Sequence, residues 1–276
     1  MVRDWKNMNA LVTGGGSGIG LDVTRKLLGE GAHVTIVGRS DERLANARQQ
    51  LAGEDLPVEK LHTVAANISI EDEVAAAVAA ATSVTGQLNS VVACAGEPRG
   101  QMAPVTHLDV DQWKSTFDNN VLGTMLTLKH GARELVRSGG GSIVAVSSIS
   151  GVMTARFASP ISAAKAALEQ LVRIAAHELG PSNVTVNAIR PGLVEVERQG
   201  PMPGGMKQDW LELIPMGRLG RPRDIAGIVT FLVGPEAGWL TGQVFSVDGG
   251  QTLVRAFDAS PWVEPMFGKD AMRGVI

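Results

Sequence analysis

A glycine-rich turn near the amino terminus carries the clearest chemical signal in this sequence. Residues 13–20 read TGGGSGIG and lie between a short β-branched run, residues 9–13, and a helical pattern that starts at residue 19. Glycines permit a tight turn and let the backbone approach a pyrophosphate, while the amino end of the next helix offers N–H groups to the phosphate oxygens. The turn therefore predicts a dinucleotide site at Gly14, Ser17, Gly18, Ile19 and Gly20.

The end of the second predicted strand bears on which dinucleotide binds. Residues 37–40 read VGRS, so Gly38 offers no carboxylate to hold the free ribose hydroxyls of NAD. Arg39 offers a guanidinium that pairs well with the 2′-phosphate of NADP. We therefore expect NADP(H). NAD(H) is the alternative, because Asp41 and Glu42 are close enough in the chain to leave Arg39 as an ordinary surface cation.

The elements that must position these residues follow a simple alternation. Short β-branched runs alternate with longer helical patterns, and several runs are apolar on both faces, as in a parallel sheet covered by helices on both sides. The sequence thus predicts an α/β fold, a doubly wound Rossmann-type sheet of about seven strands with ligands at the carboxyl ends of the strands. The predicted strands are 9–13, 33–38, 61–66, 90–95, 142–148, 184–189 and 243–248. The predicted helices are 19–29, 41–52, 71–84, 109–137, 160–179 and 222–233.

Composition limits the class of protein. The chain has 276 residues, of which 44% are hydrophobic and 19% charged, with a net charge of -3, as in an ordinary globular protein without a nucleic-acid surface. It shows neither a signal-peptide pattern nor an apolar run long enough to cross a bilayer, so we expect a soluble, cytoplasmic protein. Cys94 is the single cysteine and is interpreted as an inert core thiol, and no histidine has metal-ligand spacing.

Two segments interrupt the alternation of strands and helices. We assign residues 1–252 to a single domain, in which residues 195–220, rich in Gly, Pro and Met, form a substrate lid. Residues 253–276 form a C-terminal extension, either a loose end or, as Trp262, Met266 and Phe267 favour, a packed arm on a neighbouring subunit. Apolar residues of the lid suggest a substrate with an apolar portion. They are Met202, Met206, Trp210, Leu211 and Leu213.

Over nearly its whole length the chain resembles the short-chain dehydrogenase/reductase family. TGGGSGIG is similar to the family's TGxxxGxG turn, ACAG at 93–96 stands for its NNAG strand end, and RPG at 190–192 is similar to its PG turn. Residues 217–226 and 240–250 resemble its carboxy-terminal signatures. The resemblance implies that further residues contact the cofactor. They are Asn67, Ala95, Gly96, Pro191, Gly192 and Val194.

The same resemblance implies hydride transfer between a nicotinamide and a carbonyl or alcohol. Asn120, Ser148 and Lys165 match family residues that hold a water, orient the substrate oxygen and hold the ribose. The family's YxxxK motif, however, becomes ISAAK, so Ile161 stands in place of the catalytic tyrosine, and the chain contains no tyrosine at all. Isoleucine exchanges no proton, and the loss of a positioned acid lowers the rate about 10²- to 10⁴-fold. Ordinary ketone reduction should therefore be slow.

An active site without an acid still suits some reactions. Ser148 with Asn120 and Lys165 could stabilise an enolate oxygen during hydride addition to a conjugated double bond. The 2,4-dienoyl-CoA reductase branch of the family likewise lacks this tyrosine. Our leading hypothesis is a homodimeric or homotetrameric oxidoreductase that acts on a small-molecule carbonyl or enoyl substrate. The alternative is a cofactor-binding family member without redox activity, which serves as a partner subunit, a sensor or a non-redox lyase or isomerase.

A few charged residues lie on the substrate side of the predicted site. Arg156 is either a cation within the pocket or a solvent-facing loop residue, and Glu97 and Arg99 present the same two readings. Val196 replaces the threonine of the family's PGxVxT turn, and Glu195 brings negative charge to the same edge.

Overall fold

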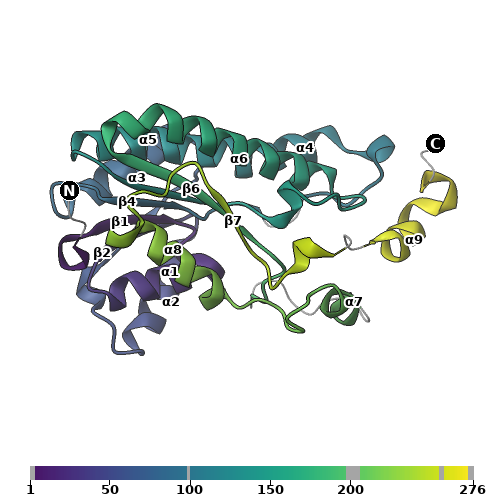
Figure 1. Ribbon diagram of the computed structural model, residues 1–276, viewed down its shortest axis with the longest axis horizontal. Helices are drawn as coiled ribbons and strands as arrows, with labels where there is room; N and C mark the ends of the chain where they lie inside the picture. Colours follow the sequence, from purple (N-terminus) through teal and green to yellow (C-terminus); the bar gives the residue numbers. More distant parts are fainter. Residues whose placement is uncertain (1–3, 98–99, 197–205, 255–257, 273–276) are drawn as a thin grey trace.

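Seven strands form one parallel sheet in a computed structural model of the protein (Figure 1). The structure describes residues 4–97, 100–196, 206–254 and 258–272. The strand order is β3-β2-β1-β4-β5-β6-β7, which confirms the predicted doubly wound sheet. The strands are β1 (Asn9–Thr13), β2 (His33–Gly38), β3 (Leu61–Ala65), β4 (Ser90–Ala93), β5 (Gly141–Val146), β6 (Val184–Pro191) and β7 (Val244–Val247).

Helices cover both faces of the sheet, as crossover connections between parallel strands require. One face carries α1 (Gly18–Gly29), α2 (Asp41–Ala52) and α8 (Pro222–Val233), which lie below the sheet in Figure 1. The other face carries α3 (Glu71–Ser83), α5 (Gly123–Arg137) and α6 (Ser159–Leu179), which lie above it.

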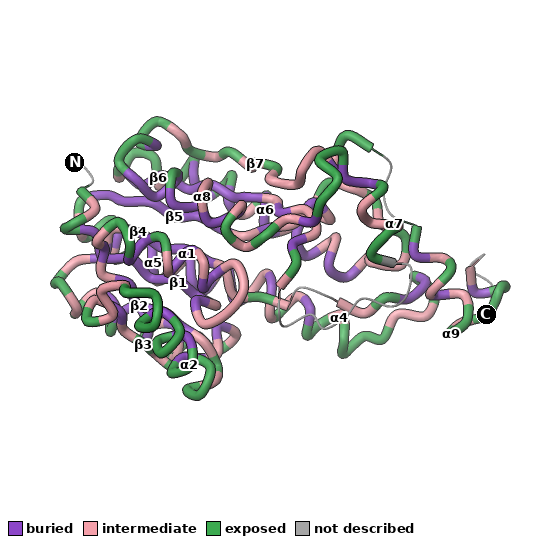
Figure 2. Tube along the Cα trace, turned by 90° about the horizontal axis from the view of Figure 1, so that it is seen from below, coloured by how far each residue is buried: buried purple, intermediate pink, exposed green. Residues whose placement is uncertain are grey.

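The core consists of two apolar layers, one on each face, because successive side chains of a strand point to opposite sides. Val12 of β1 packs with α1 and α8, where Leu27 and Leu232 are fully buried. Its neighbour Leu11 packs on the opposite face with α5 and α6, where Leu168 is fully buried. In Figure 2 the tube is purple, the colour of buried residues, through the strands in the middle of the sheet. Such a sheet holds the ends of its strands at fixed positions.

The helix predicted over residues 109–137 is divided into three parts. These are α4 (Val110–Phe117), a π-helical segment η4 (Asp118–Leu122) and α5. A π-helical turn places an extra residue in the helix and often marks a functional site. The predicted strands 90–95 and 142–148 also end early, at Ala93 and Val146, where the chain leaves the sheet.

The C-terminal extension forms a helix, α9 (Ser260–Ala271), against the lid segment of the same chain. Ala259 and Val263 are buried together with Leu213, which follows the lid helix α7 (Met206–Glu212). Trp210, Trp262 and Phe267 border this cluster, whereas Met266 is exposed. Figures 1 and 2 both place α7 and α9 at the same end of the molecule. Met202 of the predicted lid lies outside the described residues.

Candidate active site

The glycine-rich turn lies at the carboxyl end of β1 and fits closely against the end of β4. Gly14 has φ +70°, and a Cβ there would lie 2.9 Å from the Ala95 Cα. A Cβ on Gly20 would lie 2.2 Å from the Gly14 carbonyl oxygen. The side chain of Ser17, the N-cap of α1, makes no capping hydrogen bond, so the first N–H groups of α1 remain available to an outside acceptor. The turn is therefore suited to hold a pyrophosphate.

The segment after β6 closes over this turn from the other side. A Cβ on Gly192 would lie 2.8 Å from the Asp248 Cα, so only glycine fits between the ends of β6 and β7. Val194 pairs with Gly220 as an isolated bridge. Further along, Val196 Cγ1 would lie 3.3 Å from a Cβ on Gly18. The segment from Pro191 to Val196 and the glycine turn thus face each other, as two walls of one candidate cofactor site.

Two further predicted cofactor contacts lie after β2 and β3. Arg39 is exposed, and its side chain makes no ion pair or hydrogen bond with the part of the chain that the structure describes. Asn67 is half-buried, and its Oδ1 accepts a hydrogen bond from the Ser69 backbone N–H at 3.1 Å. Glu73 Oε2 accepts the backbone N–H of Asn67 at 2.6 Å. The Asn67 turn is therefore shaped by its own polar groups.

Asn120 and Lys165 approach one another across Gly96. A Cβ on Gly96 would lie 2.8 Å from Asn120 Oδ1 and 3.8 Å from Lys165 Nζ. The π-helical segment η4 carries Asn120, whose Nδ2 donates to the Thr116 carbonyl oxygen at 2.9 Å. Asn120 Oδ1 is buried and has no hydrogen-bond partner among the described residues. It is thus an available acceptor beside a cationic donor.

Lys165 is buried, with 7% of its surface exposed, and its Nζ donates to the Val146 carbonyl oxygen at 3.1 Å. Burial disfavours the ammonium and lowers the pKa of Lys165 to about 8, while Cys94 and Glu169 act in the opposite direction. Burial raises the pKa of the Cys94 thiol to about 12. Cys94 therefore remains a thiol at neutral pH, in keeping with an inert role.

The two other catalytic positions implied by the resemblance lie after β5 and at the start of α6. Ser148 follows β5, and its Oγ lies 2.8 Å from Ser150 Oγ. Ile161 is 8% exposed and lies four residues before Lys165, on the same face of α6. A Cβ on Gly100 would lie 3.3 Å from the Ile161 backbone nitrogen, so the loop after β4 packs on this turn. An apolar side chain thus occupies the position where an acid was expected.

Other predicted residues lie away from this centre. Arg156 Nη1 donates to Ser260 Oγ at 2.7 Å, and Nη2 donates to the Met272 carbonyl oxygen at 3.4 Å. Its guanidinium therefore binds the C-terminal extension, and the side chain is exposed, in agreement with the reading of Arg156 as a solvent-facing loop residue. Glu97 is half-buried, and Arg99 lies outside the described residues.

Sequence reasoning missed Glu169, which lies one turn beyond Lys165 on α6, is buried, and accepts hydrogen bonds from Ser147 and Arg190. Its signal was available in the spacing, because residues four apart on a helix share a face. The partners of Glu169 could not be predicted from the sequence, because they depend on how β5 and β6 end beside α6.

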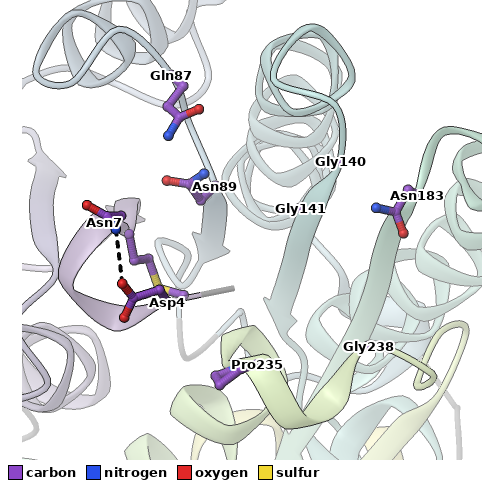
Figure 3. Close-up of a pocket in the computed structure, with 10 residues that line it drawn as sticks. Asp4, Asn7, Gln87, Asn89, Gly140, Gly141, Asn183, Pro235 and Gly238 are labelled. Carbon is purple, nitrogen blue, oxygen red and sulfur yellow. Dashed lines mark hydrogen bonds between the residues drawn. The ribbon is translucent and has the colours of Figure 1, made fainter. Parts of the chain in front are cut away.

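A cavity of about 240 Å³ lies at the opposite end of the strands from the glycine-rich turn, where the strands begin (Figure 3). Its polar groups bind one another: Asn7 Nδ2 donates to Asp4 Oδ2 at 3.0 Å, and Asn89 Oδ1 accepts the Asn9 backbone N–H at 2.8 Å. Ligands of doubly wound sheets bind at the carboxyl ends, so this cavity is distinct from the candidate active site.

Within the described ranges, no group of three or more His, Cys, Asp or Glu side chains is arranged to hold a metal ion. No helix within these ranges has the length and apolar character needed to cross a membrane.

Comparison with known proteins agrees with this geometry. The family model described as enoyl-(acyl carrier protein) reductase matches residues 14–252. The chain is 35% identical to cis-4-hydroxycyclohexanecarboxylate dehydrogenase of Sinomonas cyclohexanicum over 89% of its length and 96% of the relative's. It is 35% identical to human dehydrogenase/reductase SDR family member 4, over 88% of its length and 87% of that protein's. A short-chain type dehydrogenase/reductase from Mycobacterium ulcerans has a similar structure, with a TM-score of 0.93, 43% identity and 98% of each chain covered.

Proposed function

The chain belongs to the short-chain dehydrogenase/reductase family, and we propose that it is an NADP(H)-binding oxidoreductase whose site works without the tyrosine used elsewhere in the family. One observation carries the proposal. Lys165 and Asn120 Oδ1 adjoin the glycine turn's neighbour Gly96, while Ile161 occupies the turn of α6 before Lys165. This arrangement supports a cofactor site that keeps the family's lysine and asparagine and lacks its acid.

The chemistry divides between cofactor and protein. When bound, the nicotinamide supplies or accepts the hydride. The Ser148 hydroxyl donates a hydrogen bond to the substrate oxygen, on which negative charge develops during reduction. Lys165 holds the ribose hydroxyls and adds positive charge to the same region, and Asn120 accepts a hydrogen bond from a water beside Lys165.

In a site that lacks a proton donor at position 161, the rate depends on how much the substrate oxygen needs a proton during hydride transfer. A saturated ketone needs a proton as its oxygen becomes an alkoxide, and the chain places Ile161 where that proton donor would stand. A conjugated enone or enoyl thioester gives an enolate, whose oxygen needs stabilisation more than immediate protonation. We therefore favour a conjugated enoyl substrate, or a carbonyl activated by its neighbours, with an apolar portion directed toward the lid residues Trp210 and Leu213.

The preference for NADP(H) is supported by the surroundings of Arg39. Asp41 and Glu42 lie in the first turn of α2, where negative charge is favoured by the helix dipole. Neither residue pairs with Arg39 among the described residues, so the guanidinium is free to bind a 2′-phosphate.

Substitution of Ile161 tests the proposal. NADPH oxidation is measured with 2-cyclohexenone and with cyclohexanone, which share a ring and differ in conjugation, for the wild type, Ile161→Tyr and Ile161→Phe. We expect the wild type to reduce only the enone, and Ile161→Tyr to gain about 10²-fold or more with cyclohexanone. Ile161→Phe supplies the ring without the hydroxyl and should gain nothing.

Two results would count against the proposal. Equal rates of cyclohexanone reduction by the wild type and Ile161→Tyr would show that position 161 does not limit proton delivery. No oxidation of NADPH by the wild type with either ketone, together with no gain from Ile161→Tyr, would favour the alternative, a cofactor-binding protein without redox activity.

A further inference from the structure

A buried carboxylate lies directly beneath the candidate active site. The side chain of Glu169 is 3% exposed. Its Oε1 accepts hydrogen bonds from Ser147 Oγ at 2.8 Å and from Arg190 Nε at 2.7 Å, and its Oε2 accepts one from Arg190 Nη2 at 2.6 Å. Arg173 Nη2 lies 3.8 Å from Oε2. The carboxylate is thus held on both oxygens.

Stability alone is a weak reason to keep such a pair. Removing two charges from water costs several kcal/mol per ion, and well-packed apolar residues often replace a buried ion pair without loss of stability. The loop after β5 is also adapted to Glu169, because a Cβ on Gly151 would lie 2.9 Å from Glu169 Oε1. A costly and closely fitted charge pair indicates a role in arranging its neighbours.

Those neighbours are the parts of the site. Ser147 immediately precedes Ser148 at the end of β5, and Arg190 immediately precedes Pro191 and the Gly192 turn at the end of β6. Glu169 itself lies one helical turn after Lys165 on α6. The Glu169 carboxylate therefore connects α6, which carries Lys165, with the ends of β5 and β6. Ser148 follows β5, and the Gly192 turn of the cofactor site follows β6.

We propose that Glu169 is a positioning residue, which holds the ends of β5 and β6 against α6 through Ser147 and Arg190 and keeps Lys165 charged and directed toward the ribose hydroxyls. The last part rests on the proposed function, because it assumes a dinucleotide along Lys165. Two titratable groups affect the pKa of Lys165: Cys94 after β4, which is a neutral thiol at neutral pH, and Glu169 on α6, which favours the ammonium. Arg190 and Arg173 in turn face Glu169.

A double substitution separates positioning from stability. Glu169→Leu with Arg190→Met replaces the ion pair with apolar groups, so the variant should unfold at a urea concentration near that of the wild type. Two properties are then measured. The first is the titration of Lys165 in the cofactor-free protein, followed by NMR of ¹³Cε-labelled lysine and assigned with Lys165→Met. The second is the Kd for NADPH, measured by calorimetry.

We expect the Lys165 pKa to fall below the wild-type value, because a nearby negative charge is lost. The Kd for NADPH should rise about tenfold, the effect of losing one charge-assisted hydrogen bond. Glu169→Gln removes the charge and keeps the shape of the side chain. If the double variant does not fold, Glu169→Gln should show the same fall in the Lys165 pKa and the same rise in the Kd for NADPH. Glu54→Gln is the control, since Glu54 pairs with Arg25 on the opposite face of the sheet and should change neither property.

A folded double variant with the wild-type Lys165 titration and the wild-type Kd would overturn the inference, since Glu169 would then be only structural. The two proposals fail in different ways. If the wild type binds no NADPH, the proposed function fails, and the Lys165 titration alone decides the role of Glu169.

Discussion

At the scale of single residues, the site keeps a lysine but lacks the proton donor that should accompany it. Lys165 and Ile161 share one face of α6. The Lys165 ammonium would lower the pKa of a tyrosine at position 161, but this chain has an isoleucine there. Lys165 nevertheless remains buried, which is unfavourable for a charged group that serves no purpose. Its burial makes the cost of that charge measurable.

Lys165→Met should raise the stability of the cofactor-free protein at neutral pH. The pKa of Lys165 is lowered from 10.5 to about 8 in the folded state, so the folded state disfavours the ammonium relative to the unfolded chain. Removing the charge should increase the free energy of unfolding by up to about 3 kcal/mol below pH 8. The difference should shrink as the pH rises from 8 to 10.5, where the wild type itself loses the proton.

Urea unfolding at intervals between pH 6 and pH 10 measures this difference. Lys114→Met is the control, because Lys114 is exposed on α4 and should give a small difference that does not vary in this way. A Lys165→Met variant that is less stable than the wild type at pH 7 would contradict the assignment of a costly buried ammonium.

Arg39→Ala should weaken binding of NADPH and leave binding of NADH nearly unchanged. The guanidinium is exposed and unpaired among the described residues, so its contribution depends on the 2′-phosphate. Losing one charge-assisted contact predicts about a tenfold higher Kd for NADPH. Nicotinamide fluorescence measures both constants, with Arg133→Ala on α5 as a matched surface control. Equal weakening of both dinucleotides would show that Arg39 acts on something other than the phosphate.

At the scale of elements, the lid helix α7 and the C-terminal helix α9 stabilise one another. Val263 of α9 is fully buried with Leu213 after α7, and the Phe267 ring lies 5.5 Å from that of His107, after β4. Arg156, after β5, is bonded to the same extension. The extension therefore contacts loops that follow β4, β5 and β6, all at the substrate side of the sheet.

Val263→Asp should release α7 without affecting cofactor binding. An unpaired buried carboxylate lowers the local stability by about 2 kcal/mol, which corresponds to about 30-fold faster amide exchange. Hydrogen exchange followed by mass spectrometry reads residues 206–216. Met266→Asp places the same charge at an exposed position of α9 and should leave exchange unchanged. Unchanged protection of α7 in Val263→Asp would show that α9 does not hold the lid helix.

The elements also show what the sequence could and could not predict. All seven strands were predicted to within two residues at each end, because short apolar and β-branched runs between helical patterns give a strong signal. The π-helical segment at Asn120 was missed, since local pattern does not distinguish it from a continuous helix. Helix α9 was missed because Pro265 and Gly268 interrupt its pattern, and it forms by packing on the lid.

At the scale of the whole molecule, the parallel sheet explains why the site residues meet. The glycine turn, Gly96, Ser148 and Gly192 all follow the carboxyl ends of strands, and strand order places β1, β4, β5 and β6 side by side. Their convergence could be predicted from the sequence because the fold was. The buried network of Glu169 could not, since it depends on side chains brought together by three separate elements.

Calorimetric titration of the purified protein with NADPH, NADP, NADH and NAD measures whether the protein binds a dinucleotide and whether it prefers one that carries the 2′-phosphate. No substrate is needed, and far-UV circular dichroism establishes that the protein is folded. We expect binding of NADPH and NADP, and binding of NADH and NAD that is weaker by about tenfold or more. If the folded protein binds none of the four, the proposed cofactor site is wrong.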